Sequence, residues 1–171
     1  MKQPTHDRQQ WIRQAVEQYE RPLVLYAWRL TMNLELAREV VQDTFLKLCD
    51  QTPEDIQDHL AQWLYTVCRN RSLDVARKEK PMKPLSEPDH LVKDQQTPPP
   101  ESQLEQAELS QQLAQALSSL PANQQEVIRL KFQHGLSYKD IAKTTQLTTT
   151  HVGYLIHVGI KSLRQQLAAQ A

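Results

Sequence analysis

The stretch from residue 137 to residue 167 constrains the fold more than any other, because its spacing predicts a helix, a tight turn and a longer helix. Ser137 is followed three residues later by Asp140, which is the pattern of a capping box, so a helix is predicted to begin there. Thr148 can cap a second helix after a turn of about three residues. These short-range signals predict a helix-turn-helix at the end of the chain.

The second predicted helix has an apolar side and a polar side. Its apolar residues recur at the three- and four-residue spacing of one helix face: Val152, Ile156, Ile160, Leu163 and Leu167. The residues off that face are polar, aromatic or basic: Thr149, Thr150, His151, Tyr154, His157 and Lys161. In a helix-turn-helix the first turns of the second helix enter the major groove, so this polar side is a candidate DNA-contacting surface. The alternative is a helical packing unit without a nucleic-acid role.

Two segments carry a family resemblance. LPANQQEVIRLKFQHGLSYKDIA, at 120–142, resembles the start of the promoter-binding C-terminal domain of bacterial sigma factors, and HVGYLIHVGIKSLR, at 151–164, resembles its recognition helix and tail. The chain thus resembles an extracytoplasmic-function (ECF) sigma factor of the sigma-70 family. The resemblance implies that the polar side of the second helix contacts the minus-thirty-five promoter element.

The recognition helix departs from the family pattern in charge. Many members carry arginines where this chain has Gly153, Val158 and Ile160, and a glycine in the turn where it has Gln146. Few basic side chains are left for phosphates, so we expect weak affinity for DNA in isolation. Weak affinity suits a subunit that binds promoters only when it is held on RNA polymerase.

The first half of the chain predicts three helices. They are expected over 6–31, from Asn33 to about Asp50, and from about 57 to 80. Pro22 is expected to kink or restart the first helix, Asn33 can cap the second, and residues 51–57 are predicted to form a turn. Glycine is scarce and no stretch alternates with a period of two. The predicted fold class is therefore all-α, with two small helical domains.

The second predicted helix of this half carries an acid and amide stripe. Glu39, Gln42, Asp43 and Leu46 recur at three- and four-residue spacing beside an apolar face that includes Phe45. AREVVQDTFLKL, at 37–48, resembles the segment by which sigma factors dock on the largest subunit of RNA polymerase, and implies that the stripe binds polymerase. Spacing alone favours a solvated helix face. Arg38 departs from the pattern, because an acid is usual there.

The third predicted helix ends in a basic segment. WLYTVCRNRSLDVAR, at 63–77, resembles the helix that binds and helps to open the minus-ten promoter element. Basic side chains bind the phosphates of separated strands, which makes Arg69, Arg71, Arg77 and Lys78 candidate contacts. The resemblance implies that Asn70 is a further contact. Trp63 is predicted to be a core residue. Asp74 is predicted to pair with Arg71 or Arg77 rather than to act in catalysis.

A linker is predicted between the two domains, because residues 81–103 contain six prolines and few apolar side chains. The predicted boundaries are 1–80 for a domain like sigma region 2, 81–103 for a flexible linker, and 104–171 for a domain like sigma region 4. The resemblance implies that the linker runs toward the active-site cleft of polymerase.

Two further helices are predicted before the helix-turn-helix. The first carries an apolar stripe that is expected to pack behind the helix-turn-helix: Leu104, Ala107, Leu109, Leu113, Ala116 and Leu117. The second is bracketed by Pro121 at its start and Gly135 just past its end.

Composition excludes several function classes. The chain has 20 basic and 20 acidic residues, which argues against an autonomous DNA-binding protein. Cys49 and Cys68, at no zinc-ligand spacing, are predicted to be buried thiols. No signal peptide, membrane span, metal site, cofactor motif or catalytic motif is present in the sequence, so we expect a cytoplasmic protein without enzymatic activity or a small-molecule substrate.

The expected partners are core RNA polymerase and promoter DNA, with no membrane. Whether an anti-sigma factor holds the chain silent is left open by the sequence. Two other hypotheses compete. An autonomous helix-turn-helix regulator would bind its operator tightly without polymerase, and a sigma look-alike would occupy polymerase without reading promoters.

Overall fold

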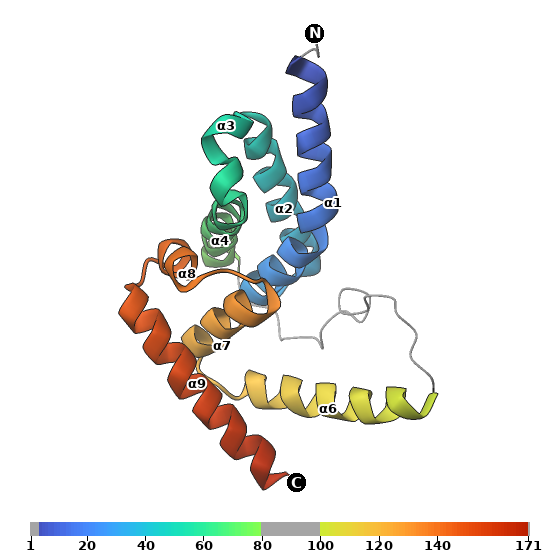
Figure 1. The fold of residues 1–171 in the computed structure, drawn as a ribbon, viewed down its shortest axis with the longest axis vertical. Helices are drawn as coiled ribbons and strands as arrows, with labels where there is room; N and C mark the ends of the chain where they lie inside the picture. The colour runs from blue at the N-terminus through green and yellow to red at the C-terminus, as the bar shows by residue number, and fades with distance from the viewer. Residues whose placement is uncertain (1–3, 80–99, 171) are drawn as a thin grey trace. The chain divides into compact units, whose positions relative to one another are not determined.

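The computed structural model describes residues 4–79 and 100–170, and within these ranges the regular secondary structure is entirely helical. The predicted all-α class is confirmed. The chain divides into two units, Met1–Asp94 and Gln95–Ala171, which are described separately below (Figure 1). Most of the predicted linker, including its prolines up to position 99, lies outside the described residues.

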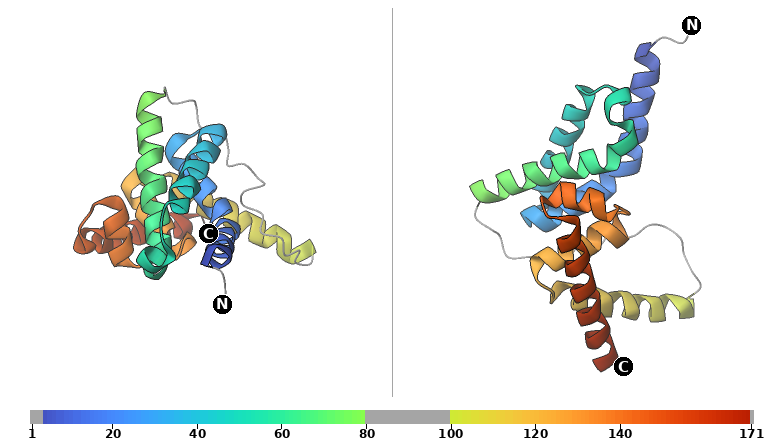
Figure 2. Two further views of the ribbon diagram at one scale, coloured as in Figure 1. Left: turned by 90° about the horizontal axis from the view of Figure 1, so that it is seen from above. Right: turned by 60° about the vertical axis from the view of Figure 1, so that its left-hand side comes forward.

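Three long helices build unit 1. Its elements are α1 (Pro4–Thr31), α2 (Leu34–Cys49), α3 (Pro53–Ile56), a 3₁₀ turn η1 (Gln57–His59) and α4 (Leu60–Lys78). α1, α2 and α4 pack against one another, as the views in Figure 2 show. Their shared core includes Leu23, Val40, Leu48, Leu64 and Tyr65, all at most 1% exposed. The rings of Tyr26 and Tyr65 meet edge to face, with centroids 5.3 Å apart.

The ends of these helices follow local chemistry. The Asn33 side chain accepts a hydrogen bond from the Leu36 amide at 3.2 Å, so the predicted cap of α2 forms. α1 is continuous through Pro22, which corrects the expected restart. Residues 23–28 directly after Pro22 are all buried, and this burial holds the helical backbone despite the missing amide proton. The predicted turn at 51–57 contains the short helix α3, with Pro53 at its first position.

Between residues 100 and 170, unit 2 contains four α-helices and a π-helical turn. They are α6 (Pro100–Ser118), α7 (Ala122–Ile128), the π turn η2 (Arg129–Gln133), α8 (Tyr138–Thr145) and α9 (Thr149–Ala169). α7 and α8 both pack on α9 around Val127, Leu130, Ile141 and Val152, each at most 1% exposed. α7 packs closely on α9 at Gly159, where an added Cβ would lie 2.5 Å from the Ile128 Cδ1 atom.

α6 differs from its prediction in where it begins and in how much of it is buried. It begins at Pro100, inside the predicted linker. Its leucines were expected to pack behind the helix-turn-helix, but Leu104, Leu109 and Leu113 are 68%, 59% and 40% exposed. Among the described side chains of α6, from 103 to 118, Ala116 alone is buried. The physical reason is length, because the first half of the helix extends away from α9 (Figure 1).

Candidate functional site

The helix-turn-helix of unit 2 is held by two side-chain caps. The Ser137 hydroxyl accepts a hydrogen bond from the Asp140 amide, and the Thr148 hydroxyl accepts one from the His151 amide, both at 3.1 Å. Gln146 takes the left-handed conformation, with φ 61°, and ends α8 where the family pattern has glycine. The predicted helix-turn-helix is therefore confirmed.

The two sides of α9 lie as the spacing predicted. Val152, Ile156 and Leu163 are buried, whereas Ile160 and Leu167 are half-buried. The candidate DNA contacts are all exposed: Thr149, Thr150, His151, Tyr154, His157 and Lys161. Tyr154 is 60% exposed, and its ring stacks on that of His151 at a centroid distance of 6.2 Å. The polar side of α9 is thus a continuous surface with two stacked rings near its start.

A contact beside this surface was not foreseen from the sequence. The Lys131 Nζ atom lies over the ring of Tyr138, 5.2 Å from its centroid. The same ring lies against α9 at Gly153, where an added Cβ would be 3.6 Å from the Tyr138 Cε2 atom. A glycine in a helix interior is unfavourable and can indicate a close neighbour, but the structure leaves room for a Cβ at Gly153, so this glycine does not account for the contact.

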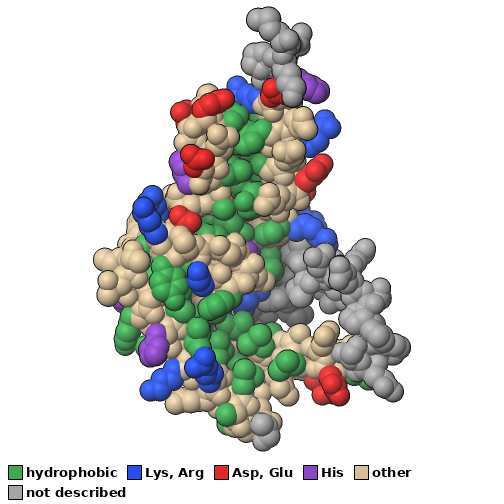
Figure 3. All heavy atoms as spheres, in the orientation of Figure 1, with side chains coloured by type: hydrophobic (Ala, Val, Ile, Leu, Met, Phe, Trp, Pro, Cys, Tyr) green, Lys and Arg blue, Asp and Glu red, His purple; other side chains and the backbone are tan. Residues whose placement is uncertain are grey.

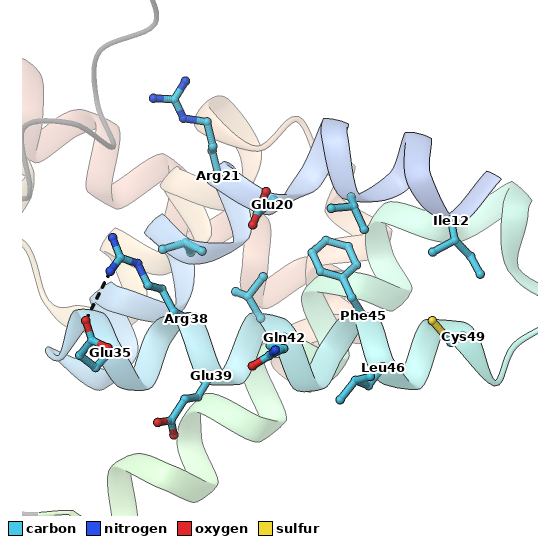
Figure 4. Close-up of a pocket in the computed structure, with 13 residues that line it drawn as sticks. Ile12, Glu20, Arg21, Glu35, Arg38, Glu39, Gln42, Phe45, Leu46 and Cys49 are labelled. Carbon is cyan, nitrogen blue, oxygen red and sulfur yellow. Dashed lines mark hydrogen bonds and ion pairs between the residues drawn. The ribbon is translucent and has the colours of Figure 1, made fainter. Parts of the chain in front are cut away.

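On unit 1, a groove of about 660 Å³ runs between α1 and α2. Three of the four candidate polymerase-binding residues line it: Glu39, Gln42 and Leu46. Figure 4 shows Phe45 directed from α2 toward α1, with Glu39 and Leu46 at the other edge of α2. Apolar side chains follow the line between the two helices in Figure 3. Leu46 is 61% exposed and lies beside this apolar groove, so the two together form a larger apolar surface of the kind that marks an interaction site.

Arg38 also lines this groove. Its guanidinium lies 3.3 Å from the Glu35 carboxylate, one helical turn earlier, and both side chains are largely exposed (Figure 4). The pair places a basic group at the position where the family pattern has an acid, with an acid beside it. Exposed pairs of this kind contribute little to stability, so the pair mainly sets the local charge of the rim.

The fourth candidate, Asp43, does not line the groove. Its carboxylate accepts a hydrogen bond from the Arg71 Nε atom at 3.0 Å, across the α2–α4 contact, and the two side chains are 40% and 39% exposed. Arg71 is itself a candidate contact for the opened strand. The structure therefore pairs a predicted polymerase-binding residue, Asp43, with a predicted DNA-binding residue, Arg71. Asp74 pairs with Arg77, at 3.8 Å, which is one of the two pairings predicted for it.

The remaining candidates on α4 lie toward its C-terminal end. Asn70, Arg77 and Lys78 are exposed, and Arg69 is half-buried. Trp63 is half-buried rather than fully enclosed in the core. Basic side chains in the last turn also interact favourably with the helix dipole, so their position has a structural role besides any contact with DNA.

The two cysteines differ in their exposure to solvent, whereas both were predicted to be buried. Cys68 is buried among α1, α2 and α4, and burial raises the pKa of its thiol to about 12. Cys49 is exposed, which corrects the expectation of two buried thiols. It is the last residue of α2, where the helix leaves the core, and its carbonyl accepts a hydrogen bond from Arg8.

The described residues hold neither a metal-binding cluster nor a helix suited to span a membrane. In 4–79 and 100–170 no group of three or more His, Cys, Asp or Glu side chains could hold a metal ion. None of the helices in these ranges combines the length and apolar composition that a bilayer crossing requires.

Comparison with known proteins gives consistent matches on both units. Residues 15–81 match the family model of sigma-70 region 2, and residues 110–163 match that of sigma-70 region 4. The chain is 31% identical to the ECF RNA polymerase sigma factor SigL of Mycobacterium tuberculosis, over 83% of this chain and 80% of the relative. It is 27% identical to the ECF RNA polymerase sigma factor SigW of Bacillus subtilis, over 89% of this chain and 86% of the relative.

Solved structures share the fold. The chain superposes on CnrH, solved in complex with the cytosolic domain of CnrY, with a TM-score of 0.60 and 22% identity, over 95% of this chain and 91% of the other. It superposes on the sigma factor RpoE of Bartonella quintana, solved with the anti-sigma factor NepR, with a TM-score of 0.60 and 20% identity, over 93% and 98% of the two chains.

Proposed function

The chain belongs to the ECF RNA polymerase sigma factors of the sigma-70 family, and we propose how its two units share the work of such a factor. It directs core RNA polymerase to specific promoters and takes part in transcription initiation. Its partners are core RNA polymerase and promoter DNA. It acts in the cytoplasm, and the chemistry of RNA synthesis belongs to the polymerase. Residues 1–80 serve polymerase binding and minus-ten recognition, and the helices from α6 onward serve minus-thirty-five recognition, with the segment that precedes α6 as the tether.

Polymerase binds at the groove between α1 and α2. The observation that supports this assignment is the exposed Leu46 beside Glu39 and Gln42, at the edge of an apolar groove. Leucine supplies the buried contact, whereas the carboxylate and amide fix the orientation through hydrogen bonds at the rim. Asp43 acts indirectly, by holding Arg71 on α4 at 3.0 Å.

The opened minus-ten strand binds along α4. Arg69, Asn70, Arg71, Arg77 and Lys78 supply donors to its phosphates and bases. Because Arg71 is paired with Asp43, its side chain has fewer accessible rotamers than a free arginine and loses less conformational entropy when it binds.

The duplex of the minus-thirty-five element binds the polar side of α9. Thr149, Thr150 and His151 lie in its first turn, where a recognition helix reaches base edges, and Tyr154, His157 and Lys161 follow along the same exposed side. Hydroxyl and imidazole groups donate to and accept from base edges, whereas Lys161 binds a phosphate.

The test is transcription in vitro from a promoter library, with core RNA polymerase of the source organism. Three variants separate the three assignments: Leu46→Ala, Arg77→Gln with Lys78→Gln, and Tyr154→Ala with His157→Ala. The first should reduce all transcripts through weaker polymerase binding, and excess protein should restore them. The second should reduce strand opening without weakening polymerase binding. The third should change which upstream sequences are used. An unchanged promoter profile for the third variant contradicts the assignment of α9 as the reader.

A further inference from the structure

We propose that Arg8 is a positioning residue for polymerase binding, because it holds the first turns of α1 against the end of α2 and so completes the apolar groove between these helices. The proposal rests on the function proposed for this groove, that core RNA polymerase binds there. Arg8 precedes residue 15, where the match to sigma-70 region 2 begins, and it is not among the candidates found from the sequence.

The Arg8 side chain reaches from one helix to the other. Its Nη2 atom donates hydrogen bonds to the carbonyl of Cys49 and, at 3.0 Å, to the carbonyl of Gln51. Cys49 is the last residue of α2, so an arginine 41 positions earlier in the chain caps the C-terminal end of this helix. Carbonyls at a helix end lack partners within the helix, and they carry the partial negative charge that a guanidinium stabilises.

Local hydrogen bonds satisfy the carbonyls just before this end. The Asp50 amide donates to the Lys47 carbonyl at 3.1 Å, and the Gln51 amide donates to the Leu48 carbonyl at 3.0 Å. The contacts of Arg8 begin at the next carbonyl along the chain. The end of α2 is therefore completed by a side chain of α1.

The same contact fixes one end of the groove. Ile12 and Cys49 both line the groove, and Figure 4 shows them on facing helices at the same end of it. Ile12 follows Arg8 by four residues, which places the two side chains on the same side of α1. Holding Arg8 on the end of α2 therefore holds Ile12 against the groove.

The first turns of α1 have little other support. None of the side chains from 6 to 14 is buried, and Ala15 is the first buried residue among the described side chains of α1. A helical segment with so few buried contacts opens readily, and a partner that needs it in place must then bear the cost of ordering it. Arg8 lowers that cost by keeping the segment in place before polymerase binds.

The experiment measures two quantities on the full chain: amide hydrogen exchange by residue, and affinity for core RNA polymerase by competition. Arg8→Gln should speed the exchange of residues 9–14 by about 2- to 10-fold through loss of the hydrogen bonds, and should leave the buried residues 23–28 unchanged. Affinity for polymerase should fall by about 2- to 5-fold, because fewer chains have the groove complete before binding. Arg8→Lys should restore both quantities, since an ammonium group can donate to both carbonyls.

Arg13→Gln is the matched control. It removes the same charge from an exposed arginine of α1 that does not line the groove, so both quantities should stay within error of the wild type. An equal loss of affinity in Arg13→Gln would make the effect one of net charge and would overturn the proposal.

The positioning role is also wrong if Arg8→Gln leaves exchange at 9–14 unchanged, because any loss of affinity would then come from a direct contact. Faster exchange at 23–28 as well would mean general destabilisation, and unchanged affinity would mean that polymerase does not use the first turns of α1. Leu46→Ala separates this inference from the function on which it rests. If Leu46→Ala weakens polymerase binding and Arg8→Gln does not, the inference alone fails, whereas unchanged binding for Leu46→Ala refutes the groove assignment itself.

Discussion

The pairing of Asp43 with Arg71 makes a prediction that separates two roles for the aspartate. If Asp43 acts by holding Arg71, then Asp43→Ala should slow promoter opening, and it should have little further effect when Arg71→Ala is already present. If Asp43 instead binds polymerase directly, its replacement should weaken polymerase binding by the same factor in both backgrounds. A double-mutant cycle on the two residues decides between them.

The expected size follows from the geometry. Two unit charges 3.0 Å apart attract by about 1.4 kcal/mol in a water-like dielectric, and the side chains of Asp43 and Arg71 are 40% and 39% exposed. Ordering two partly exposed side chains and screening by salt reduce this to about 0.5–1 kcal/mol. The opening rate should therefore show a coupling of roughly two- to fivefold between the two changes.

Two readouts are needed, the affinity of each variant for core polymerase by competition and the rate of strand opening by a fluorescent base in the minus-ten element. The pair Asp74 and Arg77 gives the control cycle, because it lies on the same helix at 3.8 Å with side chains 54% and 76% exposed. Its coupling should be close to zero. The positioning role is refuted if Asp43→Ala lowers polymerase affinity equally with and without Arg71 and shows no coupling in the opening rate.

Four further outcomes are expected. Leu46→Ala should lower the affinity for core polymerase by about 1–2 kcal/mol, because most of this leucine is left to be buried by a partner, and a competition assay measures the loss. Gly153→Ala should raise the free energy of unfolding by up to about 1 kcal/mol, because its Cβ would make an ordinary contact. Gly159→Ala should lower the free energy of unfolding, because its Cβ would meet a side chain at 2.5 Å. Thermal melting of the two variants measures both changes. Iodoacetamide at pH 8 should alkylate Cys49 but not Cys68 in the folded chain, as mass spectrometry can show. Because the pKa of Cys68 is about 12 when folded and about 9 when exposed, its contribution to stability is complete below pH 9 and is lost as the pH rises toward 12.

The sequence predicted what depends on neighbours along the chain. The caps of α2, α8 and α9 were found because Asn33, Ser137 and Thr148 act on amides three residues away. The faces of α9 followed from spacing for the same reason. These local signals can be identified in a single sequence because they do not depend on which other helix packs against the element.

Features that depend on distant residues were missed or misassigned. Asp43 and Arg71 are 28 positions apart, so each was assigned to a different partner. The leucines of α6 satisfy the spacing of a buried stripe, yet spacing does not reveal that α9 covers the end of the helix alone. Whether the first helix would only kink at Pro22 or restart there was left open by the sequence, and the burial of the residues that follow Pro22 accounts for the absence of a restart.

The exposed leucines of α6 have a consequence for the dynamics of unit 2. The first half of α6 buries no described side chain and therefore has little tertiary support. A helical segment as short as this half is only marginally stable in water by itself. Amide hydrogens there should exchange with solvent at nearly the rate of an unfolded peptide, while those near Ala116 are protected by contact with α9. Protection that spreads toward Leu104 when the chain joins polymerase would mean that the assembled enzyme orders this helix, and would show how far along it the contact reaches.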